Sequence, residues 1–257
     1  MLLAIDIGNT HTVVGLFEGD ELRFRWRMAS DARRTGDEFG ILVRELCAQS
    51  GVEFGEISGV VVCSVVPALT SALSEMAERL MRIAPVVVGP ELDLGITIDY
   101  FDPKEVGPDR LANAVAVHEA VSGPAVVVDF GTATTFDAVT ADGHYLGGAI
   151  APGVVTSAEN LFRRGALLPR VAVDPPPNVM GKSTEEAMRS GIIYGAVGQV
   201  DEIVRRIVEE WGESPTVVAT GGLAGTIASF SKTIESVEPD LTLRGLAAIY
   251  HRVTPAG

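Results

Sequence analysis

The sequence predicts an α/β protein built from two similar domains, each a mixed β-sheet flanked by helices. Short β-branched runs alternate with segments of helical periodicity, as expected for that class. The 28 glycines and the apolar fraction of 47% favour a globular chain with tight loops over a disordered or fibrous one. With about 150 residues per domain as a rough guide, two ordinary domains fit the length of 257 residues.

A hairpin near the N-terminus is repeated about halfway along the chain. Residues 2–17 read LLAIDIGNTHTVVGLF, and residues 125–139 read AVVVDFGTATTFDAV, so the pattern D-x-G-x-x-x-T occurs twice. The matching positions are Asp6 and Asp129, Gly8 and Gly131, and Thr12 and Thr135. The turns EGD at 18–20 and ADG at 141–143 share the same offset, which indicates that a whole hairpin is repeated.

The loop of the first hairpin has the chemistry of a phosphate site. Asp6 alone could simply end a strand and cap a turn, because aspartate is common in such places. Gly8 adds little bulk, however, and Asn9, Thr10 and Thr12 add side-chain and backbone groups, while magnesium is typically held by one or two carboxylates together with phosphate oxygens. The duplication favours phosphate binding, because two such hairpins would face one another across a cleft, each holding phosphate from one side.

The rest of the first half is expected to alternate strands and helices. Residues 21–28 alternate apolar and charged side chains and predict a third strand with one wet face. Residues 36–50 carry apolar side chains at helical spacing, with two acids in the first turn. The other expected elements are a strand at 57–63, a helix at 67–83, a strand at 86–88, and, after a long irregular segment at 89–109, a helix at 111–121.

The second half begins after the break at Ser122-Gly123-Pro124, which divides the chain into predicted domains 1–122 and 123–257. After the repeated hairpin, the proline-rich residues 167–179 are expected to be extended. The remaining expected elements are a long helix capped by Ser183 or Thr184 and running to Trp211, a strand at 216–219, and helices at 223–231 and 241–253.

Two further segments could contact a ligand. Residues 220–222, Thr-Gly-Gly, follow a strand and open a helix, and their glycines suit close packing as well as nucleotide binding. Residues 107–110, Gly-Pro-Asp-Arg, precede a helix. Asp109 could cap that helix, or it could orient or deprotonate a substrate hydroxyl while Arg110 binds an anionic group.

The sequence does not support a P-loop, a cysteine-based site or a histidine-based site. Residues 181–183, Gly-Lys-Ser, resemble the end of a P-loop, but the required earlier glycine would fall at Pro176. Cys47 and Cys63 form no CxxC pair and are expected to be buried thiols. The histidines show no metal spacing and no Ser-Asp neighbours, so each is expected to be structural; they are His11, His118, His144 and His251.

Charge and hydropathy limit the partners. The formal net charge of −14 opposes non-specific attraction to nucleic acid or to anionic lipid, so an anionic substrate would need a local basic site. The N-terminus lacks the basic region and cleavage site of a signal peptide, and no run approaches the roughly 18 apolar residues of a membrane span. We therefore expect a cytoplasmic protein.

The duplicated acidic hairpin and the later glycine pair resemble the actin, hexokinase and Hsp70 ATPase superfamily, and within it the chain resembles type III pantothenate kinases over essentially its full length. DIGNTHTVVGLF corresponds to the first phosphate motif of that family, DFGTATTFD to the second, GPDR to the pantothenate site and TGGLAG to the nucleotide region. The resemblance implies two actin-like (ribonuclease H-like) domains with an ATP cleft between them.

The resemblance also implies residue roles and ligands. Asp109 would be the base acting on the hydroxyl of pantothenate, Asp129 would hold a monovalent cation (K⁺ or NH₄⁺), and Asp6 would hold magnesium with ATP. The implied ATP contacts are Asp6, Ile7, Gly8, Asn9, Thr10, His11, Thr12, Val13, Thr132, Gly221 and Gly222. The implied substrate contacts are Tyr100, Gly107, Pro108, Asp109, Arg110 and Thr184. The family is dimeric, which implies a homodimer in which Thr184 reaches the pocket of the neighbouring subunit.

The residue chemistry agrees with phosphoryl transfer, which needs charge neutralisation and in-line positioning more than covalent help. The implied reaction is phosphorylation of pantothenate to 4′-phosphopantothenate, the entry step to coenzyme A. Two alternatives remain: another activity in the same class, such as a sugar kinase or an exopolyphosphatase, and an accessory transcriptional regulator on the same fold. The acidic charge and the lack of a basic stripe count against direct DNA contact.

Overall fold

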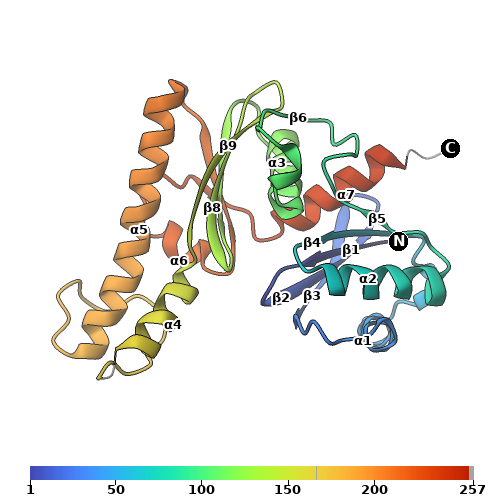
Figure 1. Cartoon of the computed structure of the whole chain (residues 1–257), viewed down its shortest axis with the longest axis horizontal. Coiled ribbons are helices and arrows are strands. Elements are labelled where there is room, and N and C mark those ends of the chain that lie inside the picture. Colours follow the sequence, from blue (N-terminus) through green and yellow to red (C-terminus); the bar gives the residue numbers. More distant parts are fainter. Residues whose placement is uncertain (166, 255–257) are drawn as a thin grey trace. The chain divides into compact units, whose positions relative to one another are not determined.

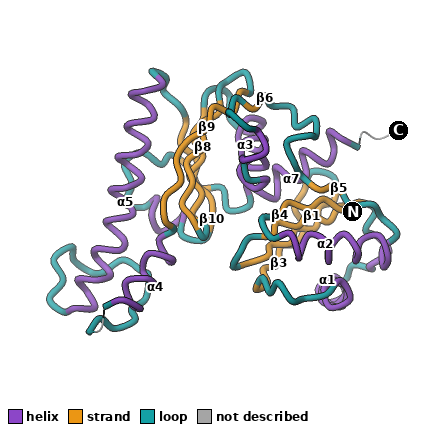
Figure 2. Tube along the Cα trace, viewed as in Figure 1, coloured by secondary structure: helices purple, strands orange, loops and turns teal. Residues whose placement is uncertain are grey.

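The computed structural model describes residues 1–165 and 167–254 and divides into two compact units (Figure 1). Unit 1 comprises Met1–Ala116 together with the chain from Leu241, and unit 2 comprises Val117–Asp240. The domains predicted at 1–122 and 123–257 place the last helix in the second half, whereas in the structure this helix packs in unit 1. The α/β class is confirmed, since helices flank a mixed sheet in each unit (Figure 2).

The sheet of unit 1 has the strand order β3-β2-β1-β4-β5. Strand β2 runs antiparallel to β1 and β3, whereas β4 runs parallel to β1, and β5 parallel to β4. The bounds are β1 Leu2–Ile7, β2 His11–Glu18, β3 Glu21–Ala29, β4 Gly59–Ser64 and β5 Val86–Val87. β1 is central and its side chains are almost all buried, which explains the continuous apolar run that the sequence shows.

Helices α1 (Gly36–Gln49) and α2 (Pro67–Met76) pack on one face of this sheet and against each other (Figure 1). The helix expected at 67–83 ends earlier as an α-helix and continues as one π-helical turn over Ala77–Met81. A capping box between Thr35 and Glu38 starts α1, so two backbone donors that the helix leaves unpaired are satisfied. Burial of the apolar stripe of each helix forms the core of unit 1.

The last helix, α7 (Leu241–Val253), packs on β1, β2 and β4 from the other face. Glycines on the strands make room for it: a Cβ atom at Gly15 would fall 2.9 Å from Leu243, and one at Gly59 would fall 2.3 Å from the hydroxyl of Tyr250. The bounds of α7 are those expected from the sequence, but its position depends on these long-range contacts, which helical periodicity does not report.

The segment 89–109, expected to be irregular, contains a short strand, β6 (Thr97–Ile98), and a 3₁₀ turn at Pro103–Glu105. Helix α3 (Pro108–Ala120) follows and begins three residues earlier than expected. Proline suits the first helical position because its fixed φ angle is already helical and its missing N–H would be unpaired there anyway. Asp109 is therefore the second residue of the helix and lies in its first turn rather than at the cap.

The strands of unit 2 repeat the arrangement of unit 1. Their order is β11-β10-β7-β8-β9, with β8 antiparallel to β7 and β9, and with β10 parallel to β7 and β11. The bounds are β7 Ala125–Phe130, β8 Ala133–Val139, β9 His144–Pro152, β10 Thr216–Gly221 and β11 Ser236–Val237. The repeat therefore extends beyond the predicted hairpin to five strands in the same order.

Three helices pack in unit 2: α4 (Val154–Arg164), α5 (Thr184–Trp211) and α6 (Ala224–Ala228). Ser183 is the N-cap of α5 and accepts a hydrogen bond from the backbone N–H of Glu186, which settles the predicted choice between Ser183 and Thr184. The core lies between the sheet and α5 and α6. Strands β9 and β11 and helix α4 were not predicted from the sequence, since the glycine-containing β9 and the two-residue β11 give no clear pattern.

Across the part of the chain that the structure describes, no helix combines the length and hydropathy needed to cross a membrane.

Candidate active site

The first candidate loop closes the hairpin between β1 and β2. The backbone N–H of Gly8 donates to the carbonyl of His11 at 3.0 Å, so Asn9 and Thr10 form the tip of a tight turn. The side chains of Asn9, Thr10 and His11 are exposed, whereas Thr12 is fully buried. The tip can therefore meet a ligand directly, and Thr12 lies behind it.

Asp6 lies near the end of β1, opposite Val13 on β2 and Cys63 on β4. Its neighbours Ile5 and Ile7 belong to the core beneath α1 and α2, so the alternation of a strand directs Asp6 toward the opposite face. The thiol of Cys63 donates a hydrogen bond to Oδ1 of Asp6 at 3.3 Å. The sequence predicts Cys63 only as a buried thiol and gives no signal for this partner of Asp6.

The second candidate loop closes the hairpin between β7 and β8. The N–H of Gly131 donates to the carbonyl of Ala133 at 3.0 Å, and Thr132 is exposed at the tip. The carbonyl of Thr132 accepts hydrogen bonds from the N–H of Gly153 at 3.2 Å and from the hydroxyl of Thr156 at 2.8 Å. The start of α4 therefore holds this loop in place.

The two hairpins differ in register by one residue. In the first hairpin Asp6 lies opposite Val13 and Thr12 lies opposite Ile7, whereas in the second Asp129 lies opposite Thr135. A shift of one residue moves a side chain to the other face of a strand. Thr135 therefore shares a face with Asp129, while Thr12 and Asp6 point to different faces, and the shared D-x-G-x-x-x-T pattern does not place its threonines equivalently.

Strand β10 brings Gly221 against Asp129. Thr220 lies directly opposite Asp129, and the backbone of Gly221 has a φ angle of +90°, which favours glycine. A Cβ atom at Gly221 would fall 2.7 Å from Oδ1 of Asp129, so glycine at this position lets the backbone of β10 approach the carboxylate closely. The next residue, Gly222, is exposed.

The Gly-Pro-Asp-Arg segment forms the start of α3. Asp109 is half-buried, and its Oδ1 accepts a hydrogen bond from the backbone N–H of Arg110 at 2.9 Å. A Cβ atom at Gly107 would fall 2.5 Å from this Oδ1, so the carboxylate lies over the glycine. Arg110 is buried, with 6% of its surface exposed, and Tyr100 on the preceding loop is half-buried. The burial of Arg110 differs from the solvent-exposed position that its side chain would have if Asp109 only capped the helix.

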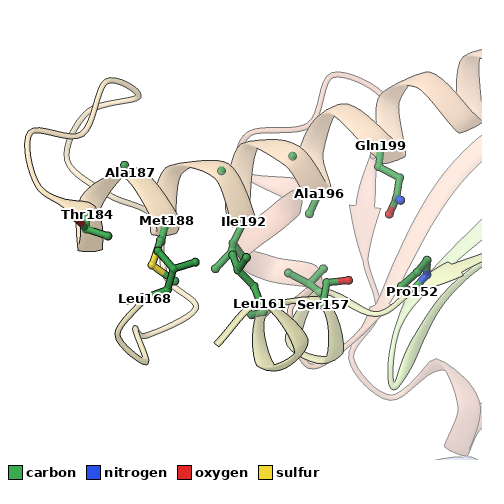
Figure 3. Close-up of a pocket in the computed structure, with 14 residues that line it drawn as sticks. Pro152, Ser157, Leu161, Leu168, Thr184, Ala187, Met188, Ile192, Ala196 and Gln199 are labelled. Carbon is green, nitrogen blue, oxygen red and sulfur yellow. The ribbon is translucent and has the colours of Figure 1, made fainter. Parts of the chain in front are cut away.

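Thr184 lies in unit 2, at the first turn of α5. It lines one end of a groove of about 640 Å³ between α4 and α5, whose walls are mostly apolar (Figure 3). Met188 and Ile192 of α5 face Leu161 of α4 and Leu168 across this groove (Figure 3). The groove is a surface of unit 2.

The acidic groups suit cations that take most of their ligands from elsewhere. Among residues 1–165 and 167–254, no three side chains of His, Cys, Asp or Glu gather as a metal cluster. Magnesium commonly uses one or two carboxylates plus phosphate oxygens and water. Asp6, beside an exposed polar loop, can provide one such carboxylate. The carboxylate of Asp129 can supply one ligand to a cation whose other ligands come from elsewhere.

Two sheets that share an order of five strands, each with an acid-bearing hairpin loop, define an actin-like kinase or ATPase fold. Solved structures agree. A protein from Campylobacter jejuni assigned to the Baf family of transcriptional activators matches with a TM-score of 0.63 and 17% identity, covering 97% of this chain and 98% of that one. A protein from Sinorhizobium meliloti assigned as a 2-dehydro-3-deoxygalactonokinase matches with a TM-score of 0.56 and 15% identity, covering 100% and 98%. At these identities the likeness shows the fold alone.

The family follows from closer relatives. The chain belongs to the type III pantothenate kinase family, whose family model matches residues 2–206. A type III pantothenate kinase from Moorella thermoacetica is 51% identical over 254 residues, which cover 99% of this chain and 100% of that protein. The resemblance found in the sequence motifs is thereby confirmed.

Proposed function

We propose that this protein phosphorylates pantothenate with ATP to give 4′-phosphopantothenate, the first step of coenzyme A biosynthesis. The observation that carries the proposal is the full-length match to a type III pantothenate kinase at 51% identity. The half-buried carboxylate of Asp109 beside the buried Arg110 supports it, because an alcohol acceptor needs a base and pantothenate carries a carboxylate.

In the proposed reaction Asp109 accepts the proton of the acceptor hydroxyl. The hydroxyl oxygen then bonds to the γ-phosphorus of ATP, and the bond from that phosphorus to the oxygen of the ADP leaving group breaks. Arg110 binds the carboxylate of pantothenate, and Tyr100, Gly107 and Pro108 shape the same pocket. Asp109 contributes by orientation as well as by proton transfer, since positioning supplies much of the catalysis in phosphoryl transfer.

We assign nucleotide binding to residues 6–13, Thr132 and the glycine pair Gly221-Gly222. Magnesium bound with ATP would be held by Asp6, and a monovalent cation, K⁺ or NH₄⁺, by Asp129; both supply positive charge for the phosphates. The chain itself supplies exposed polar groups at the tip of the first loop and little side-chain bulk at both glycines. A cytoplasmic location suits this function and the two free cysteines, Cys47 and Cys63, both of which are buried.

We further propose that the protein is a homodimer formed through the groove between α4 and α5. Leu161 of α4 is exposed there, and Gly191 and Gly195 of α5 have open space beyond their Cα atoms, so a partner helix could approach closely. Glycine inside a helix costs about 0.5–1 kcal/mol relative to alanine, which argues for a packing reason to have it. Thr184 at the edge of this groove would then lie near the partner subunit.

The test is a substrate panel with purified protein, ATP, magnesium and K⁺ or NH₄⁺. We expect pantothenate to be phosphorylated and sugars and polyphosphate to be poor substrates. Turnover of a sugar or of polyphosphate without turnover of pantothenate would contradict the proposal in favour of another activity of the same fold.

A further inference from the structure

We propose that Ser30, a residue outside the recognised motifs, is the positioning residue that fixes the first phosphate loop. Ser30 follows β3 directly and lies beside the loop between β1 and β2. The inference rests on the proposed function, because it assumes that this loop binds the phosphates of ATP.

Three hydrogen bonds join Ser30 to the loop. Its backbone N–H donates to the carbonyl of Thr10 at 3.0 Å. Its hydroxyl donates to the carbonyl of Gly8 at 2.7 Å. The hydroxyl oxygens of Ser30 and Thr12 are 2.9 Å apart. The residue that follows the neighbouring strand β3 thus holds the start, the tip and the end of the loop.

The proton count fixes the direction of this network. A hydroxyl has one hydrogen, and the hydrogen of Ser30 is given to the carbonyl of Gly8. The Thr12 hydroxyl must therefore be the donor to Ser30, which gives a chain from Thr12 through Ser30 to Gly8. Consecutive hydrogen bonds in such a chain polarise and strengthen one another.

This direction changes the role expected of Thr12. Its side chain is fully buried and its one hydroxyl hydrogen points to Ser30, away from the exposed tip at Asn9. Thr12 therefore supports the loop from behind, and its hydroxyl gives no hydrogen bond to phosphate. Both backbone groups of Gly8 are also engaged, its N–H with His11 and its carbonyl with Ser30.

The consequence for function is preorganisation of the tip. A loop held at Gly8, Thr10 and Thr12 loses little conformational freedom when a ligand binds, so the binding free energy is not spent on ordering it. Removal of the Ser30 hydroxyl should weaken ATP binding, although Ser30 itself touches no substrate. Binding of pantothenate, assigned to the start of α3, should change little.

The test compares Ser30→Ala with Ser30→Thr and with Ser58→Ala. Ser58 is the matched control, because its hydroxyl also donates to a backbone carbonyl in the same unit, that of Met1, but near the N-terminus. The dissociation constant of Mg-ATP is measured by calorimetry, and KM for ATP, KM for pantothenate and Tm are measured alongside it. We expect Ser30→Ala to weaken Mg-ATP binding about tenfold, the loss of about 1.4 kcal/mol typical of one or two hydrogen bonds.

The other variants separate positioning from stability. Ser30→Thr keeps the hydroxyl and should restore Mg-ATP affinity to within about twofold of the wild type, and Ser58→Ala should lower Tm without changing that affinity. If Ser30→Ala does not fold, Thr12→Val interrupts the same chain from its other end and should show the same weakening. In the double variant that combines Ser30→Ala with Thr12→Val, the losses of Mg-ATP binding free energy should not add, because both changes break one network.

Several results would overturn the inference. They are unchanged Mg-ATP affinity in Ser30→Ala, equal increases of KM for ATP and for pantothenate, or a failure of Ser30→Thr to restore binding. A wild-type protein that binds Mg-ATP but leaves pantothenate unphosphorylated would defeat the proposed function alone, since calorimetry would still test Ser30. A wild type that binds no Mg-ATP would defeat both.

Discussion

Gly221 lies directly against Asp129: a Cβ atom on Gly221 would fall 2.7 Å from Oδ1 of the carboxylate, and as close to the backbone N and O of Phe130. The φ angle of +90° at Gly221 adds a second reason for glycine at this position. A residue assigned to nucleotide binding and a residue assigned to cation binding are thus in contact, which couples the two assignments.

Replacement of Gly221 by alanine should therefore impair the cation site. We expect the concentration of K⁺ or NH₄⁺ needed for half-maximal activity to rise about tenfold or more, because the methyl group displaces Asp129. Gly212→Ala is the control: its φ angle is +76° but its surroundings are open, so it should cost only backbone strain of about 1–2 kcal/mol. If Gly221→Ala and Gly212→Ala need the same concentration of K⁺ or NH₄⁺ for half-maximal activity, Gly221 does not affect the cation site.

The Cys63 thiol should orient Asp6. Cys63→Ala removes the donor to Oδ1 of Asp6 and should raise the magnesium concentration for half-maximal activity about fivefold, whereas Cys63→Ser keeps a donor and should change it little. Cys47→Ala is the matched control, because Cys47 is also a buried thiol of unit 1, whose pKa burial raises, but it lies in α1. A magnesium titration in which all three variants coincide would remove Cys63 from this role.

Local patterns predicted much of the fold because they depend on residues near in sequence. The helix expected at 241–253 and the cap at Ser183 are present in the structure, since periodicity and capping are short-range properties. The placement of α7 was not predictable in this way, because it depends on Gly15 and Gly59 in distant strands.

In the candidate site too, features that depend on nearby residues were predictable and those that depend on long-range contacts were not. The acids of both hairpins could be found from the repeat, but the register of the strands could not. Thr12 and Thr135 were therefore grouped, although Thr135 shares a face with the acid of its hairpin and Thr12 does not. Ser30 and Cys63 carry no motif and lie 18 to 57 residues from their partners. Contacts of this kind come from the pairing of neighbouring strands, which only the folded chain reveals.

The groove between α4 and α5 should determine the oligomeric state. Gly195→Leu adds a side chain in the groove, at a position where nothing lies within 4 Å of an added Cβ atom. We expect sedimentation to show a dimer for the wild type and a monomer for Gly195→Leu. The control is Glu210→Leu, an exposed position farther along α5 and outside the groove. A dimer that persists in Gly195→Leu would show that another surface forms it.

Acid should weaken one exposed network of α5. Hydrogen bonds from the side chains of Arg205 and Arg206 lower the pKa of Glu202 from 4.5 to about 2. A carboxylate with a lowered folded-state pKa stabilises the protein fully above pH 4.5, and this contribution is lost as the pH falls toward 2. Denaturant titrations should show less loss of stability over this range for Glu202→Gln than for the wild type, and about 1 M salt should reduce the difference. Equal losses of stability in the two proteins would mean that the interactions of Glu202 with Arg205 and Arg206 contribute nothing measurable to stability.

The most direct test of the proposed activity is the rate of pantothenate phosphorylation by Asp109→Asn. Loss of a general base typically costs about 10²–10⁴ in rate, and the change should leave Mg-ATP affinity and Tm close to the wild type. Asp102→Asn is the control from the same segment, since Asp102 only caps the 3₁₀ turn and asparagine can also cap. A kcat reduced by at least about a hundredfold in Asp109→Asn alone is the result we predict; full turnover of pantothenate by Asp109→Asn would contradict the assignment of the catalytic base.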